Sequence, residues 1–214
     1  MAQLSETLVS ITLDDVVLEG ALEIPEGATG LVVFVHGSGS SRKSPRNNYV
    51  AHVLRDRRLG TLLFDLLTEA EDRVPEARFD IPLLSGRLQA VTQWLGRRPE
   101  TESLRVGYLG TSTGAAAALR AASCAPAGER VGAIVSWGGR VDMAPEALPA
   151  VQAPCLFIVG GADSQVRRLN RDAYAQLTCK KAFHEVEGAG PLLRGSGELG
   201  EMAQAAADWF AETL

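Results

Sequence analysis

The sequence has little of what would mark an extracellular, membrane or nucleic-acid-binding protein. Its three cysteines (Cys124, Cys155 and Cys179) are widely spaced and include no C-x-x-C pair. This argues against a disulfide framework or a zinc site and fits a reducing cytoplasm. The N-terminus lacks a basic start followed by an apolar run, so no signal peptide is expected. No apolar run approaches the ~20 residues that span a bilayer.

Strong charge of either sign is also missing. The net charge is −5, and Lys and Arg form no block. We therefore expect no nucleic acid and no membrane surface among the partners. The 46% hydrophobic and 22% charged fractions are close to globular averages. There is no internal repeat or long linker, so the 214 residues are expected to form one cytoplasmic domain, 1–214.

Short apolar runs alternate with longer helical patterns along the chain. Strands are predicted at 7–13, 16–25, 30–37, 60–67, 104–110, 130–139, 154–163 and 181–188, and helices at 49–57, 83–95, 114–124, 165–176 and 197–214. The alternation indicates βαβ units around a mostly parallel sheet. The first two runs, joined by an Asp14-Asp15 turn, predict an antiparallel hairpin at one edge. The fold class is therefore α/β, a three-layer α/β/α sandwich with eight strands.

Ser112 stands at the centre of Gly110-Thr-Ser-Thr-Gly114, between a predicted strand and a predicted helix. The pattern alone is a weak signal, but this context is the one in which a nucleophilic serine sits on a strained turn. The N–H of Thr113 would then face a developing oxyanion, and the glycine-rich loop from Gly37 would supply a second N–H. The alternative is a glycine-flanked turn serine without chemistry.

Asp163 follows the seventh predicted strand. In sheets of this kind, ligands bind outside the carboxyl ends of the strands, and an aspartate there could orient a catalytic imidazole. The alternative is that Asp163 caps the helix that begins at Gln165.

Several stretches resemble the α/β-hydrolase superfamily, and more narrowly the small serine hydrolases related to dienelactone hydrolase. They include VVFVHGSGSS, LLFDLLT, VGYLGTSTGAAAAL and PCLFIVGGAD, and together the similar stretches span most of the chain. The resemblance implies an α/β-hydrolase fold with Ser112 as nucleophile, where true dienelactone hydrolases carry cysteine. It implies Asp163 as the acid and an oxyanion hole of Gly37, Ser38 and Thr113. No metal or organic cofactor is implied.

The sequence departs from this family at the catalytic base. Where the family has a histidine after the eighth strand, this chain reads GAGPLLRGSGEL, so Gly190 or Pro191 takes that place. The predicted triad is incomplete, and a serine without its base cannot be activated in the usual way. Turnover would then need substrate assistance, an unusual base, or a slow reaction.

Other residues could act as a surrogate base. His36 is the best placed because it adjoins the predicted oxyanion loop, although in the family this residue braces the loop. His184 lies within a predicted strand and His52 within a predicted helix. Lys43 is a further option, since a desolvated lysine can act as a base. Alternatively, Arg42, Lys43 and Arg46 could form a rim that binds an anionic substrate.

Three hypotheses follow. The first is a hydrolase of small esters, lactones or thioesters. The second is a lyase or isomerase step that uses the same oxyanion hole, and the third is an inactive protein that binds a small molecule or a protein. The short connection after the sixth predicted strand indicates an open site and a small substrate or ligand. The chain is expected to be a monomer or a homodimer.

Overall fold

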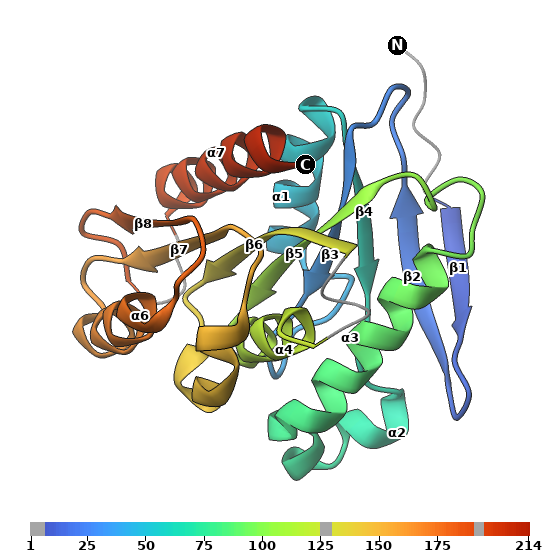
Figure 1. Ribbon diagram of the computed structural model, residues 1–214, viewed down its shortest axis with the longest axis horizontal. Helices are drawn as coiled ribbons and strands as arrows, with labels where there is room; N and C mark the ends of the chain where they lie inside the picture. The colour runs from blue at the N-terminus through green and yellow to red at the C-terminus, as the bar shows by residue number, and fades with distance from the viewer. Residues whose placement is uncertain (1–6, 125–129, 191–194) are drawn as a thin grey trace.

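The computed structural model describes residues 7–124, 130–190 and 195–214, and its centre is one eight-stranded sheet (Figure 1). The strands are β1 (Thr7–Thr12), β2 (Val17–Glu23), β3 (Gly30–Val35), β4 (Leu59–Phe64), β5 (Arg105–Thr111), β6 (Val131–Trp137), β7 (Cys155–Gly160) and β8 (Lys181–Val186). Their order is β1-β2-β4-β3-β5-β6-β7-β8. β2 pairs antiparallel with β1 and β4, and all other pairs are parallel. The predicted sheet and its antiparallel N-terminal edge are confirmed.

Helices cover both faces of the sheet (Figure 1). One face carries α1 (Pro45–Asp56) and α7 (Ser196–Thr213), and the other carries α3 (Ile81–Leu95), α4 (Thr113–Ala122) and α6 (Ser164–Gln176). A short α2 (Glu69–Asp72) and 3-10 turns at Pro75–Phe79, Val141–Met143 and Pro145–Ala150 complete the connections. None of these short elements was predicted, because a single turn has no periodicity that a sequence pattern can show.

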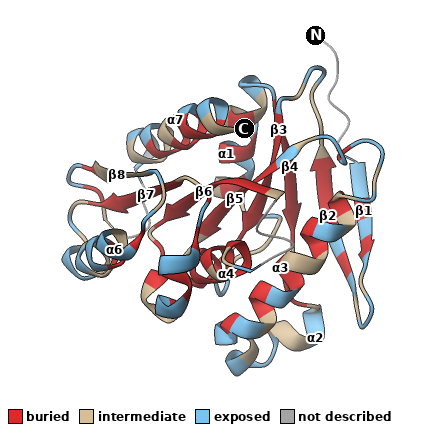
Figure 2. Cartoon of the chain, in the orientation of Figure 1, coloured by how far each residue is buried: buried red, intermediate tan, exposed pale blue. Residues whose placement is uncertain are grey.

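The core explains why the central strands are unbroken apolar runs. Every residue of β3, β4, β6 and β7 is buried, because helices cover both sides of these strands (Figure 2). Helix α4 is also buried along nearly its whole length, with Ala115 to Ala118 fully enclosed. Its small side chains let this helix lie close to the sheet, which sets the position of the residue just before it, Ser112.

The parallel strands bring the candidate residues to one edge. β3 and β5 are paired in register with Val35 opposite Gly110. His36 and Gly37 therefore leave the sheet beside the turn that holds Ser112, and Asp163 follows β7 at the same edge. Within the described ranges, no helix is long and apolar enough to cross a membrane.

Candidate active site

Ser112 adopts a strained backbone conformation, with φ of 49° and ψ of −124°. An L-residue other than glycine rarely occupies this region, and holding it there costs about 1–3 kcal/mol. The residue joins β5 directly to α4 and is half-buried. The sharp turn from strand to helix places Ser112 at the carboxyl edge of the sheet.

The turn requires glycines, because side chains at these positions would collide with neighbouring atoms. A Cβ at Gly114 would lie 1.9 Å from the carbonyl oxygen of Val35, and one at Gly110 would lie 2.5 Å from the Cα of Ala115. A Cβ at Gly37 would lie 2.7 Å from the Cβ of Ser112. The loop after β3 therefore packs directly against the serine.

Two of the three predicted oxyanion donors, the backbone N–H groups of Gly37 and Ser38, already bond to side chains of the protein. The backbone N–H of Gly37 donates to the hydroxyl of Thr111 at 3.0 Å, and that of Ser38 donates to the hydroxyl of Thr113 at 3.1 Å. The N–H of Thr113 belongs to the first turn of α4, where N–H groups have no carbonyl partner within the helix. The two threonines around Ser112 thus hold the loop, a role that the sequence analysis did not identify.

A hollow of about 140 Å³ opens beside Ser112. Its lining consists of Gly37, Ser38, Ser40, Ser44, Arg46, Asn47, Thr111, Ser112, Trp137 and Gly138. The guanidinium of Arg46 lies over the Trp137 ring, 4.9 Å from its centroid. The sequence analysis missed Trp137, although its position at the carboxyl end of β6 was a usable signal. The hollow combines one cationic group with one aromatic face.

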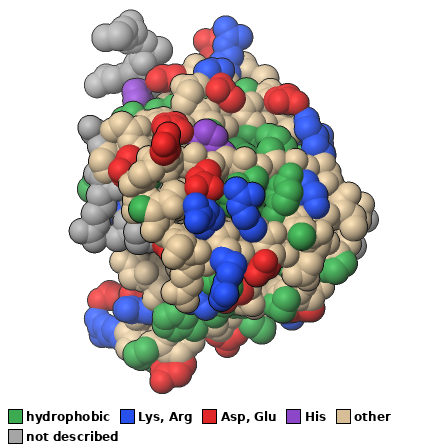
Figure 3. All heavy atoms as spheres, turned by 90° about the vertical axis from the view of Figure 1, so that its left-hand side faces the viewer, with side chains coloured by type: hydrophobic (Ala, Val, Ile, Leu, Met, Phe, Trp, Pro, Cys, Tyr) green, Lys and Arg blue, Asp and Glu red, His purple; other side chains and the backbone are tan. Residues whose placement is uncertain are grey.

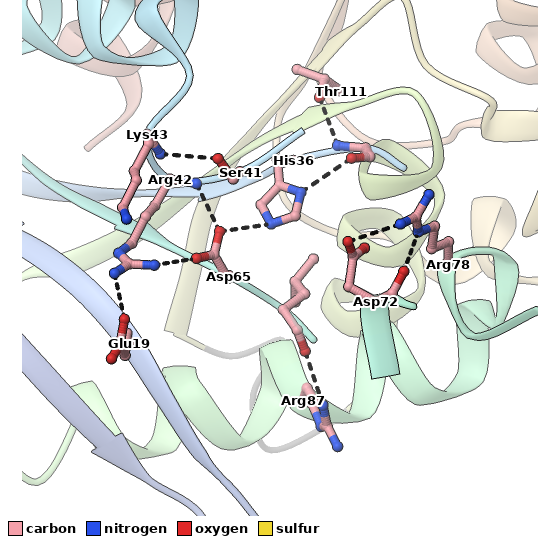
Figure 4. Close-up of polar contacts among 12 residues, drawn as sticks. Glu19, His36, Ser41, Arg42, Lys43, Asp65, Asp72, Arg78, Arg87 and Thr111 are labelled. Carbon is pink, nitrogen blue, oxygen red and sulfur yellow. Dashed lines mark hydrogen bonds and ion pairs between the residues drawn. The ribbon is translucent and has the colours of Figure 1, made fainter. Parts of the chain in front are cut away.

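Neither nitrogen of His36 is directed at the serine. Nδ1 lies 3.1 Å from the carbonyl oxygen of Gly37, and Nε2 lies 3.5 Å from a carboxylate oxygen of Asp65 (Figure 4). The imidazole therefore braces the loop after β3. As a surrogate base it would first have to leave these two contacts.

The other two histidines also have partners of their own. His52 lies 3.7 Å from Asp56 within α1, and His184 on β8 lies 2.8 Å from Glu201 on α7. Among the residues described, the hydroxyl of Ser112 makes no hydrogen bond. Within residues 7–124, 130–190 and 195–214, no base is hydrogen-bonded to the serine.

The predicted cationic rim is divided between two hollows. Arg42 bonds to Asp65 at 2.5 Å through its guanidinium and also pairs with Glu19 (Figure 4). Arg42, Lys43 and His36 line a second cavity of about 460 Å³. Of the three predicted cations, Arg46 is the one that lines the hollow at Ser112.

Asp163 caps helix α6, as its alternative interpretation predicts. One of its carboxylate oxygens accepts the N–H of Val166 at 3.0 Å. The adjacent Ala162 N–H donates to the carbonyl of Ala189 at 2.9 Å, which places the turn after β8 beside Asp163. A Cβ built at Gly190 would meet none of the described residues within 4 Å. Pro191 lies outside the described residues.

One ion pair adjoins the turn at Ser112, and a second joins α2 to α3. Arg140, whose backbone N–H donates to the carbonyl of Ser112 at 2.9 Å, pairs with Asp142 through two bonds of 2.9 Å. These bonds lower the pKa of the Asp142 carboxyl. On α2, hydrogen bonds from Arg87 lower the pKa of Glu71 to about 2. Both carboxylates are therefore ionised at neutral pH, and each is paired with an arginine.

Arg78 and Asp80 lie between α2 and α3 and have separate partners. Arg78 bonds to Asp72 at 2.9 Å. Asp80 accepts the N–H of Leu83 at 2.9 Å and caps α3. Both hold the chain between α2 and α3.

Two solved structures illustrate the similarity of this architecture to known proteins. A dienelactone hydrolase from Anabaena variabilis is 50% identical, with a TM-score of 0.95 and coverage of 99% of both chains. The protein Est1E from Butyrivibrio proteoclasticus has a TM-score of 0.79 over 97% of this chain and 98% of its own, at 14% identity, which is a likeness of fold alone. The fold is therefore the α/β-hydrolase fold.

Residues 61–187 match the dienelactone hydrolase family, and the chain belongs to that family. A curated relative from Mycobacterium tuberculosis is 49% identical over 206 residues, which are 96% of this chain and 46% of that protein. Its name assigns it provisionally as a phosphoribosyl transferase. The chain thus spans about half the length of the curated relative.

Proposed function

We propose that this protein is a serine hydrolase of small esters, lactones or thioesters, with Ser112 as the nucleophile of an acyl-enzyme. The observation that carries the proposal is the strained backbone of Ser112, held between glycines and facing a hollow. Such strain persists only where the surrounding structure enforces it, and it clusters at functional sites. The name and high identity of the Anabaena relative support the same reaction class.

In this mechanism, Ser112 Oγ attacks the carbonyl carbon and forms a tetrahedral intermediate. The oxyanion would accept hydrogen bonds from the N–H of Thr113 and from that of Ser38, once the latter releases the Thr113 hydroxyl. Collapse breaks the bond to the leaving group, which takes the serine proton through solvent. Water then hydrolyses the acyl-enzyme to the acid and regenerates Ser112.

The missing imidazole sets the expected rate. Because Gly190 or Pro191 stands where the family resemblance implies a histidine, we expect neither the serine nor the hydrolytic water to have a positioned general base. Positioning and oxyanion stabilisation alone still give roughly 10³–10⁴-fold catalysis over water in enzymes that have lost a triad member. We therefore expect acylation of Ser112 by activated esters followed by slow turnover.

The hollow limits the substrate. About 140 Å³ accommodates a small acyl group, and Arg46 beside Ser112 favours one that carries a negative charge. The finer proposal is a small anionic ester, lactone or thioester.

A second candidate is a protein of this family that does not hydrolyse its ligand, either a lyase or isomerase or a binding protein. Two points favour it. The loop amides are already bonded to threonine hydroxyls, and the sequence has Gly190 or Pro191 where the family resemblance implies a histidine. The curated relative, named for a transferase, is about twice as long as the matched segment, so its name does not decide between these candidates.

Pre-steady-state kinetics with p-nitrophenyl acetate separates the two. The hydrolase predicts a burst of about one equivalent of p-nitrophenol per chain, then a slower steady rate. The burst disappears in Ser112→Ala. Equal p-nitrophenol release by the wild type and Ser112→Ala would contradict the hydrolase proposal and favour the second candidate.

A further inference from the structure

A second cavity lies beside the loop after β3. Its volume of about 460 Å³ exceeds the 140 Å³ of the hollow at Ser112 and is within the roughly 300–1,000 Å³ typical of small-molecule sites. It lies over the start of β2 and the end of β4, whereas the hollow lies over the ends of β5 and β6. Ser40 lines both, and its N–H donates to the carbonyl of Gly37 at 3.1 Å. The two spaces therefore adjoin across one loop.

The polar wall of this cavity is held in place by contacts between distant segments. Arg42, which follows β3, donates its backbone N–H to Asp65 at 2.7 Å and its guanidinium to Asp65 and Glu19 (Figure 4). Asp65 follows β4, and Glu19 belongs to β2. The side chains of Arg42 and Asp65 are only 16% and 24% exposed. The wall is therefore formed before a ligand arrives.

A charged cluster at the opposite edge of the sheet is more open. Around β8 and α6, acidic and basic side chains are mixed at the surface (Figure 3). Arg167 and Arg171 both pair with Glu185 there, and their side chains are 39% and 59% exposed. Such exposed pairs are typical of a solvated surface, whereas the contacts of Arg42 form the wall of a cavity.

The formal charges around the cavity cancel. Its lining carries four carboxylates: Glu19, Asp65, Glu69 and Asp72. Arg42 pairs with the first two, and Arg73 and Arg78 pair with the other two. Lys43, which also lines the cavity, is the fourth cation. Four acidic and four basic side chains leave no net charge, which favours an uncharged ligand.

The lining keeps both donors and acceptors for such a ligand. Among the residues that the structure describes, the Lys43 ammonium and the Ser40 hydroxyl have no hydrogen-bond partner. Glu19 and Asp72 each bond to an arginine through one carboxylate oxygen and keep the other as an acceptor. A hydroxyl group both donates and accepts, so a ligand rich in hydroxyls uses both sets. An anion would use the donors alone, and an ammonium group the acceptors alone.

We propose that this cavity binds an uncharged polyol or sugar, which is the alcohol part of the ester cleaved at Ser112. This inference rests on the proposed hydrolase function and names its substrate class. The acyl group passes to Ser112, the bond between the acyl carbon and the polyol oxygen breaks, and that oxygen takes up the serine proton. Water then releases the acid. Leu18 and Leu67, which also line the cavity and are buried, would contact the C–H groups of the polyol.

Val17→Trp narrows the cavity with little effect on the core. Val17 lines the cavity, but it is 56% exposed on β2, so a larger side chain there need not displace buried atoms. Leu8→Trp is the matched control. Leu8 is 75% exposed on the neighbouring β1 and does not belong to the lining.

Binding is measured first, because it does not depend on turnover. Saturation-transfer difference NMR of D-glucose, D-ribose and sorbitol is recorded with Ser112→Ala protein. At least one of these polyols should give a signal that adding Val17→Trp abolishes and adding Leu8→Trp leaves unchanged. No signal from any of the three, or an equal signal with Val17→Trp, would overturn the proposal.

Acyl transfer then tests the link to Ser112. With p-nitrophenyl acetate as donor, the polyol that binds should attack the carbonyl carbon of acetyl-Ser112, take the acetyl group and return its proton to the serine oxygen. Mass spectrometry should detect the acetylated polyol, in about tenfold lower yield with Val17→Trp. A burst of p-nitrophenol without acetylated polyol would overturn the assignment of the cavity to the alcohol part. Absence of the burst itself would contradict the proposed hydrolase function, on which the binding measurement does not depend.

Discussion

The backbone N–H of Ser38 donates a 3.1 Å hydrogen bond to the hydroxyl of Thr113, the residue that follows Ser112. Gly37 makes the equivalent bond to Thr111, the residue that precedes it. The loop after β3 is therefore fastened to both neighbours of the proposed nucleophile. In the ligand-free protein, a substrate oxyanion would have to displace a threonine hydroxyl to reach the Ser38 amide.

Replacing Thr113 with valine tests this fastening. The threonine side chain is buried (2% exposed), and valine has nearly the same shape. The variant therefore fills the same space but deprives the Ser38 N–H of its acceptor. We expect the free energy of unfolding to fall by about 1–2 kcal/mol, measured by urea denaturation. Thr113→Ser retains the hydroxyl, so its free energy of unfolding should fall by less. Equal stability of the valine variant and the wild type would show that the bond does not hold the loop.

Gly190→His tests the claim that the missing base limits turnover. In the part of the chain that the structure describes, nothing lies within 4 Å of a Cβ at this position, which leaves space for a larger side chain. A positioned general base contributes about 10²–10⁴-fold. We expect steady-state hydrolysis of p-nitrophenyl acetate to rise by about 10²-fold, with no rise in Gly190→Ala. The gain must vanish when Ser112→Ala is added; a gain that persists would come from the imidazole alone.

Arg46→Met tests the preference for anionic substrates. Methionine keeps an unbranched apolar side chain beside Trp137 but removes the charge next to Ser112. We expect kcat/KM for p-nitrophenyl monosuccinate to fall by about tenfold relative to that for p-nitrophenyl acetate. A matched change at Arg42, whose charge is paired with Asp65, should leave this ratio unaltered. An equal loss for both esters in Arg46→Met would point to a structural role.

Glu71→Gln should lower stability in a pH-dependent way. Arg87 is 5% exposed and holds Glu71 through two bonds of 2.6 Å, which lower the pKa of Glu71 from 4.5 to about 2. A lowered folded-state pKa stabilises the protein above pH 4.5, and the contribution is lost as the pH falls towards 2. Because Glu71 is partly exposed, we expect a difference of about 1–2 kcal/mol at pH 7. The difference in the free energy of unfolding between the wild type and Glu71→Gln, measured by denaturation at pH 7, 5 and 3, should narrow only at pH 3.

The sequence was sufficient to predict the sheet because its signal is local. Each buried strand is an unbroken apolar run, and the elbow at Ser112 follows from a glycine pattern between a strand and a helix. The start of α1 at Pro45 was missed because the segment 45–48 is polar, although Ser44 accepts the N–H of Asn47 as a helix cap.

Contacts between distant segments were not predictable in this way. Ser38 and Thr113 are 75 residues apart, and no local pattern says that one bonds to the other. Likewise, Arg42 and Arg46 look equivalent in the sequence. The tertiary structure pairs Arg42 with Asp65 and Glu19 and turns Arg46 to Trp137. The sequence thus identified these cations by residue type, but their different roles follow from partners that only the tertiary structure shows.

The most direct test of the central claim is the mass of the intact protein after incubation with a fluorophosphonate, with Ser112→Ala alongside. The account predicts a single phosphonate adduct on the wild-type protein and none on the alanine variant, formed slowly because no histidine assists the serine. Adding the Gly190→His change should accelerate the labelling. No adduct after many hours, or an adduct that survives Ser112→Ala, would contradict the assignment of Ser112 as the nucleophile.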